Sequence, residues 1–329
     1  MREAMALLEI NDLCVNYLMA DSRVHAVEHV SLTLEEGSSM GLVGESGSGK
    51  STLGMAVLRL LSPKTAEVTG SVRFDGEELL TMPESRLRQV RWKALAAVFQ
   101  KSMNALSPVH RIGSQMADVY HLHHPEADKA ACRARVLEVL RQVDLAERVY
   151  KLYPHELSGG MMQRVSIALS LLNHPKLVIF DEATTALDVI TQGQILNEIQ
   201  HLEKELGLTR MMITHDISVV ATSCSHVAVL YAGRLMEVGP AAQVLRSPAH
   251  PYTAGLMAAF PSLHGEKKPL KGIPGALPDL SQPIPGCVFA PRCPYATEEC
   301  RKAQPPLSEM GEGRQAACYH LLTEVREHA

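Results

Sequence analysis

The strongest constraint in the sequence is a glycine-rich octapeptide, Gly44-Glu-Ser-Gly-Ser-Gly-Lys50-Ser51, which matches the phosphate-loop pattern G-x-x-x-x-G-K-[ST]. An apolar run over 40–43 predicts a strand before it, and residues 50–61 predict a helix after it. Glycines let successive N–H groups converge on an anion, while Lys50 supplies charge for terminal phosphates and Ser51 a hydroxyl for Mg2+. A chance glycine-rich turn is the alternative, but strand, loop and helix together predict a phosphate-binding βα unit.

A second apolar run, 177–180, ends in two carboxylates, Asp181 and Glu182. Its lack of alternation predicts a strand buried on both faces of a parallel sheet. We expect Asp181 to reach the Mg2+ shell and Glu182 to orient or deprotonate a water attacking the γ-phosphate. Taken alone, the pair is equally compatible with an acidic loop after a buried strand.

The rest of the chain predicts a mixed α/β protein with two additions. Alternating apolar residues near the N-terminus predict a small antiparallel sheet, and residues 92–164 predict an inserted helical subdomain. A helix is expected over 189–206, and a hairpin over 226–238. Because prolines are frequent beyond residue 250, the sequence predicts a domain over 1–250 and an irregular extension over 251–329.

Composition limits the class of protein. A formal net charge of -4 and an aromatic content of 4% do not suit nucleic-acid binding. No apolar stretch approaches the roughly 18 residues that a membrane-spanning helix needs, and the N-terminus lacks the plan of a signal peptide. We therefore expect a globular protein that stays in the cytoplasm, and any membrane role would have to come through partner subunits that carry the transmembrane helices.

The segment Leu157-Ser-Gly-Gly-Met-Met-Gln-Arg164 resembles the signature motif of ABC ATPases, and it lies between the phosphate loop and Asp181 as that family requires. The resemblance implies a P-loop NTPase (ABC ATPase) α/β core with an N-terminal antiparallel β subdomain and the helical subdomain, to which the cysteines of the tail, described below, add a small irregular metal-binding extension. Ser158, Gly159 and Gly160 would form a second anion-binding helix terminus. In isolation, Ser-Gly-Gly is more often an ordinary helix start.

Further family elements follow in order. Gln100 resembles the Q-loop glutamine that senses Mg2+ and the γ-phosphate, Asp188 ends a D-loop, His215 resembles the switch histidine, and Tyr17 sits where the family stacks an aromatic on adenine. The plain alternatives are a surface glutamine, a helix N-cap, a loop histidine and a core tyrosine. The nucleotide-binding set implied by the resemblance is Tyr17, Gly44, Glu45, Ser46, Gly47, Ser48, Gly49, Lys50, Ser51, Thr52, Ser158, Gly159, Gly160 and Asp188.

The family resemblance also implies partners. The phosphate loop of one ATPase subunit faces the signature motif of another, so ATP and Mg2+ would be held between two copies or between this chain and a similar subunit. ATP binding would close the pair, and hydrolysis assisted by Glu182 would reopen it. Two transmembrane permease subunits and an extracytoplasmic substrate-binding protein are expected, with this chain peripheral at the cytoplasmic face of the inner membrane.

Four of the seven cysteines crowd near the C-terminus with the spacing C-x5-C-x6-C-x17-C: Cys287, Cys293, Cys300 and Cys318. In a reducing compartment, such a cluster suggests a metal centre before disulfides. The extension resembles that of oligopeptide and dipeptide importer ATPases, which implies a [4Fe-4S] cluster. Zn2+ and four free thiols are the alternatives.

Two departures from the family and two alternative functions remain. Ala183 follows Glu182 where the family usually has proline, and Lys101 follows Gln100 where aspartate is common. Because Ala183 leaves both carboxylates intact, we expect hydrolysis to survive. The cargo implied is a dipeptide or oligopeptide, with nickel or a metal chelate as the alternative. A soluble ABC ATPase outside transport is a further alternative, although such proteins usually carry a second cassette or a coiled-coil insertion.

Overall fold

The computed structural model describes residues 6–99, 105–183, 188–259 and 272–322. Its contacts divide the chain into two compact units, the first formed by Met1–Thr81 and Met212–Ala329 and the second by Met82–Met211. Within the described parts, none of the helices has both the length and the apolar content of a membrane span.

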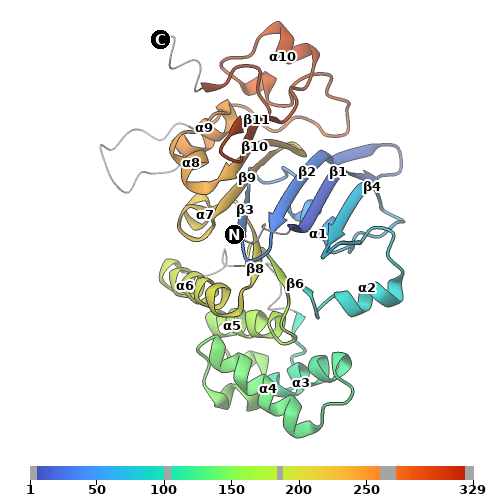
Figure 1. Cartoon of the computed structure of the whole chain (residues 1–329), viewed down its shortest axis with the longest axis vertical. Coiled ribbons are helices and arrows are strands. Elements are labelled where there is room, and N and C mark those ends of the chain that lie inside the picture. Colours follow the sequence, from blue (N-terminus) through green and yellow to red (C-terminus); the bar gives the residue numbers. More distant parts are fainter. Residues whose placement is uncertain (1–5, 100–104, 184–187, 260–271, 323–329) are drawn as a thin grey trace. The chain divides into compact units, whose positions relative to one another are not determined.

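The first unit contains a four-stranded antiparallel sheet in the order β2-β1-β4-β5 (Figure 1). The strands are β1 (Ala6–Leu18), β2 (Arg23–Glu35), β4 (Ala66–Phe74) and β5 (Glu77–Glu78). Leu8, Ile10 and Leu13 are buried, and the pairing of β1 with β2 shifts register between Ile10 and Leu13. The small antiparallel sheet predicted from the sequence is therefore present, with bulges inside its two long strands.

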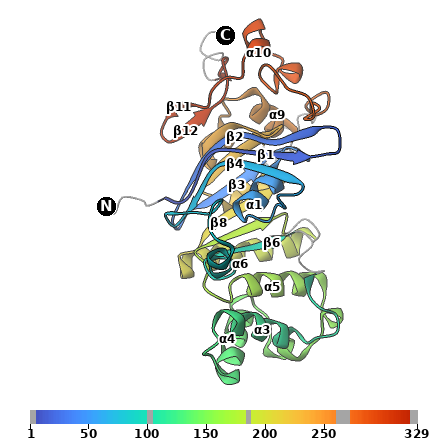
Figure 2. The same cartoon turned by 90° about the vertical axis from the view of Figure 1, so that its right-hand side faces the viewer.

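The same unit contains part of a larger sheet, in the order β11-β12-β10-β9-β3. These strands are β3 (Ser39–Val43), β9 (His226–Tyr231), β10 (Arg234–Pro240), β11 (Ser308–Gly311) and β12 (Arg314–Ala316). β3 runs parallel to β9, and the other pairs are antiparallel. Ala232 and Gly233 both have positive φ, at 48° and 79°, as a two-residue hairpin turn requires. The predicted hairpin is confirmed, and Figure 2 shows a second hairpin, β11 and β12, from the tail.

Helices complete the first unit. They are α1 (Lys50–Val57), α7 (Ile217–Ser223), α8 (Ala241–Arg246), α9 (Pro251–Ala259) and α10 (Glu298–Lys302). α1 ends four residues before the predicted position, because Arg59 takes a left-handed conformation with φ 52°.

One hydrophobic core joins β9 to the cysteine-rich tail. Tyr231 of β9 lies 4.6 Å from Tyr252 of α9 and 5.3 Å from Phe289, measured between ring centroids. Cys287 and Cys300 belong to the same buried cluster. The boundary expected between residues 250 and 251 therefore lies within one packed unit, and the division into two domains there stays a prediction.

The second unit is mainly helical. Its helices are α2 (Glu84–Val90), α3 (Ile112–His123), α4 (Lys129–Gln142), α5 (Gly159–Ser170) and α6 (Val189–Leu206). α3 packs against α4, and α4 against α5 (Figure 1). The unit also contains two parallel strands, β6 (Leu95–Phe99) and β7 (Leu177–Asp181). The division between the units falls within β8 (Thr209–Thr214).

Candidate functional site

The phosphate loop begins directly after β3, which is buried along its whole length. Gly47 and Gly49 have φ values of 80° and 101°, in the region that favours glycine. The Ser48 amide donates to the Glu45 carbonyl over 3.1 Å, which closes the loop on itself. The loop then enters α1 at Lys50, so the backbone has the curled shape that phosphate binding needs.

Lys50 is held inside this loop and is only 6% exposed. Its Nζ donates to the carbonyl oxygens of Gly44 and Glu45 over 2.9 and 2.8 Å. Tyr17 Oη lies 3.2 Å from Thr52 Oγ1, so the tyrosine of β1 reaches the first turn of α1. This places Tyr17 beside the predicted nucleotide site, whereas stacking on adenine stays a prediction.

In the second unit, β7 presents the two predicted carboxylates at its carboxyl end. Asp181 is the last residue of the strand and pairs in register with Phe99 of β6. Glu182, the next residue, has φ 48°, an uncommon left-handed conformation for a glutamate. Such local strain is often found at functional sites, because the surrounding structure must hold the side chain in one direction.

The signature segment forms a helix N-terminus in the same unit. Ser158 is the N-cap of α5, and its Oγ accepts from the Met161 amide over 3.3 Å. Ser158 and Gly159 are exposed, so the N-terminus of this twelve-residue helix lies at the surface of the unit. The structure therefore confirms the expected helix start, which is suited to an anion.

Asp188 and His215 lie at the ends of other elements. Asp188 caps α6 through hydrogen bonds from the Ile190 and Thr191 amides, over 3.1 and 3.0 Å. His215 is exposed and follows β8 in the first unit. The N-cap considered for Asp188 from the sequence is thus its observed structural role, and this leaves open a further role in the D-loop.

The four clustered cysteines line one small cavity of about 10 Å³ in the tail of the first unit. Cys287 and Cys300 are buried, while Cys293 and Cys318 are partly exposed. The Cys287 amide donates to the Cys300 carbonyl over 2.7 Å, and the His320 amide donates to Cys318 Sγ over 3.3 Å. Residues 31 positions apart therefore converge on one point, as a metal-binding set of thiols would.

Burial, together with the neighbouring thiols, raises the pKa of Cys318 to about 12 and also raises the pKa values of Cys287 and Cys293. Thiolates at these positions need a cation beside them, because their own surroundings disfavour the charge. The donor set fits a group held by four cysteines, either an iron–sulfur cluster or a zinc ion.

Two long segments of the chain are similar to known protein families. Residues 27–185 match the family described as ABC transporter, and residues 236–300 match the oligopeptide/dipeptide transporter C-terminal region. Over 324 residues, the chain is 43% identical to the oligopeptide transport ATP-binding protein OppD of Salmonella typhimurium, with 98% of this chain and 96% of the relative covered. The chain belongs to the ABC transporter ATPases.

Other ABC proteins are also similar to this chain, in sequence and in structure. The probable peptide ABC transporter ATP-binding protein y4tR of Sinorhizobium fredii is 43% identical, with 96% of each chain covered. Among solved structures, the ATP-binding cassette MJ0796, a dimer bound to ADP and Pi, has a TM-score of 0.64 and 29% identity, covering 71% of this chain and 98% of that one. The predicted ABC ATPase fold and the ATPase activity are therefore confirmed at the level of the family.

Some predicted site residues cannot be placed. The structure does not describe Gln100 and Lys101, nor the two residues that precede Asp188 in the predicted D-loop, Ala186 and Leu187. Ala183, which replaces the usual proline, is described and buried at 5% exposure. The roles assigned to Asp181, Glu182 and His215 in the ABC ATPase remain predictions.

One set of contacts at the phosphate loop was missed by the sequence reasoning. The side chains of Arg292 and Tyr252, both from beyond the predicted domain boundary, contact Glu45. The only signal in the sequence was the position of Arg292 beside Cys293, and nothing there pointed to the phosphate loop.

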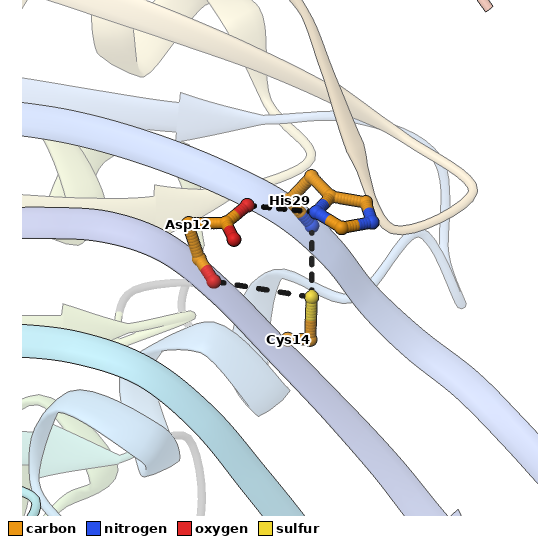
Figure 3. A group of neighbouring side chains, drawn as sticks. All are labelled: Asp12, Cys14 and His29. Atoms are coloured by element: carbon orange, nitrogen blue, oxygen red, sulfur yellow. Dashed lines mark hydrogen bonds and ion pairs between the residues drawn. The ribbon is translucent and has the colours of Figure 1, made fainter.

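A separate group of possible metal ligands, Asp12, Cys14 and His29, lies on β1 and β2 of this ABC ATPase (Figure 3). His29 Nδ1 is 2.7 Å from Asp12 Oδ1, and the His29 amide donates to Cys14 Sγ over 3.3 Å. Asp12 and His29 are exposed and have φ values of 49° and 52°. Their contacts join the bulges of two neighbouring strands, which is sufficient to account for the group.

Proposed function

We propose that this ABC ATPase powers the import of peptides. Two features support the proposal: the preformed phosphate loop that holds Lys50, and the match to the oligopeptide/dipeptide transporter C-terminal region. The near full-length similarity to a protein named for oligopeptide transport supports peptides as the cargo. On this proposal the chain works with a second ATPase subunit, two permease subunits and an extracytoplasmic binding protein, at the cytoplasmic face of the membrane.

Each nucleotide contact has a proposed role. The amides of the phosphate loop and Lys50 bind the phosphates, while Ser51, Asp181 and Gln100 complete the Mg2+ shell. Glu182 is the proposed general base, and His215 senses the γ-phosphate. Ser158 to Gly160 of the second ATPase subunit would contact the same ATP.

We further propose that the four cysteines hold a [4Fe-4S] cluster. The four thiols line one small cavity, and soft thiolates are ligands of iron–sulfur clusters and of zinc alike. The cysteine spacing C-x5-C-x6-C-x17-C lacks the close C-x2-4-C pairs that are usual at structural zinc sites, which favours the cluster. Iron and sulfide analysis of anaerobically purified protein tests the proposal, and stoichiometric zinc without iron would overturn it.

The central test is a Glu182→Gln variant of the assembled transporter. We expect it to bind Mg-ATP with wild-type affinity and to hydrolyse it at least about 100-fold more slowly, because a lost general base typically costs 100-fold or more. Glu205→Gln, an exposed glutamate of α6, is the matched control. Turnover within twofold of wild type would refute the role of Glu182.

Nucleotide binding and cargo are tested separately. Lys50→Ala should weaken ATP binding itself, because it removes the point charge of the loop. ATP-driven uptake of a labelled oligopeptide into proteoliposomes that contain the permease tests the cargo. Uptake of nickel but not of peptide would contradict the peptide proposal and leave the ATPase assignment standing.

A further inference from the structure

An ion pair joins the cysteine-rich tail to the phosphate loop. Arg292 Nη1 lies 2.8 Å from Glu45 Oε2, between residues 247 positions apart in the sequence. The Arg292 side chain is 7% exposed and that of Glu45 is 27% exposed. Because the pair is largely withdrawn from solvent, it is less screened than a surface pair and has a defined geometry.

Four further contacts hold the Arg292 side chain in place. Its Nε donates to the Pro274 carbonyl over 2.8 Å, and Nη2 donates to the Ile273 carbonyl over 3.1 Å. Nη1 also reaches Tyr231 Oη at 3.2 Å, and the guanidinium lies 5.6 Å from the centre of that ring. A planar guanidinium held in this way presents Nη1 to Glu45 in one direction.

The backbone of Glu45 is held from the same side. The Glu45 amide donates to Tyr252 Oη over 2.9 Å, and Tyr252 is fully buried against Tyr231 and Phe289. The carbonyl of the same residue accepts from Lys50 Nζ. Glu45 therefore connects the lysine of the nucleotide site to the aromatic core of the tail through its amide, its carbonyl and its side chain.

The turn that carries Arg292 also carries two of the cysteines. The Ala290 amide donates to the Cys287 carbonyl over 2.9 Å, and the Cys293 amide donates to the Ala290 carbonyl over 3.3 Å. Two backbone hydrogen bonds thus connect Cys287 and Cys293 to the short turn from which Arg292 reaches Glu45.

We propose that Arg292 is a positioning residue for the phosphate loop, and that it couples the cysteine centre to nucleotide binding. The inference rests on the proposed nucleotide site. Since binding free energies are reciprocal, a nucleotide that tightens the loop also restrains the cysteine turn, and loosening the turn weakens nucleotide binding.

The first test measures Mg-ATPγS affinity in the full-length protein by titration calorimetry. We expect Arg292→Gln and Glu45→Gln each to weaken binding by about tenfold, between the effects of exposed and buried pairs. The double variant should bind no more weakly than either single variant, because all three lack the same ion pair. Arg292→Lys, which keeps the charge, should restore part of the affinity.

Arg301→Gln is the matched control, because Arg301 belongs to the same tail but its side chain is 60% exposed and pairs with Glu298. Glu45→Gln leaves every tail residue intact, so it separates positioning from misfolding of the tail. Wild-type affinity in both Arg292→Gln and Glu45→Gln, or fully additive losses in the double variant, would overturn the proposal. Failure of the wild-type protein to bind ATPγS would instead refute the proposed nucleotide site.

The second test measures coupling in the opposite direction. Hydrogen exchange of the amides of the turn 287–293 is followed by peptide mass spectrometry, with and without Mg-ATPγS, on the protein as purified. Nucleotide should slow this exchange severalfold in wild type and in Arg301→Gln, but not in Arg292→Gln. An equal effect of nucleotide in all three proteins would refute the coupling.

Discussion

Gly44 is confined more tightly than the other glycines of the phosphate loop. Its φ is 156°, and a Cβ built there would lie 2.1 Å from the Leu230 carbonyl oxygen. A real Cβ cannot approach a backbone atom so closely, so either β9 or the loop must move. The close approach of β9 thus requires glycine at position 44, in addition to any requirement that comes from binding phosphate.

A Gly44→Ala substitution should therefore destabilise the protein by about 2 kcal/mol or more and abolish ATP binding. The matched substitution is Gly193→Ala in α6, where nothing lies within 4 Å of the new Cβ and φ is not positive. That change should stabilise the protein by about 0.5–1 kcal/mol, because alanine loses less backbone entropy in a helix. Urea unfolding measures both, and equal effects at the two positions would contradict this account.

At the scale of elements, the local pattern of apolar residues predicted helices and strands best where the backbone is regular. The predicted helix over 189–206 has the observed bounds of α6, and the predicted hairpin coincides with β9 and most of β10. β1 and β2 are longer than the alternation suggested, because left-handed residues such as Asp12 break the period of two. The motif residues could be predicted because each is close in sequence to the element that positions it.

The cap of α6 offers a test at this scale. Asp188→Ala should lower the melting temperature by a few degrees, because two backbone amides and the Thr191 hydroxyl lose their acceptor. Asp188→Asn should keep most of the cap. If this variant is stable yet hydrolyses ATP slowly, the carboxylate has the proposed D-loop role as well.

The same residue gives a dependence on pH. The Thr191 amide lowers the pKa of Asp188 in the folded protein. A depressed carboxyl pKa stabilises the fold above the unfolded pKa of about 3.9, and the contribution is lost as the pH falls through the folded value. The difference in melting temperature between wild type and Asp188→Asn should therefore be constant near neutral pH and shrink as the pH falls below the unfolded pKa of the carboxyl group.

At the scale of the whole molecule, the least predictable feature was the packing of the tail. Its prolines correctly indicated short elements, but the contacts of Phe289 with Tyr231 and Tyr252 join segments far apart in sequence. The spacing of apolar residues along the sequence does not indicate which distant segments will contact one another. The Arg292–Glu45 pair was unpredictable for the same reason.

Phe289 allows this shared core to be tested. Phe289→Ala should destabilise the first unit by about 3–5 kcal/mol, as expected for a buried phenylalanine. Hydrogen exchange should then accelerate in the amides of β9 as well as in the tail. Leu122→Ala, at a residue 76% exposed, should change stability by less than about 0.5 kcal/mol. Faster exchange confined to the tail would show that the tail unfolds separately.

The pairing of β12 with β10 has one more consequence. Glu237 and Val238 of β10 are aligned with Ala316 and Gln315, so the tail occupies hydrogen-bonding groups that would otherwise form a bare strand edge. A proteolytic cut that removed the β11–β12 hairpin would leave the backbone N–H and C=O groups of β10 unpaired, and strands of other molecules could then pair with them. Chains shortened in this way should therefore aggregate. The amount of soluble protein should fall before the ATPase activity of the protein that stays in solution does.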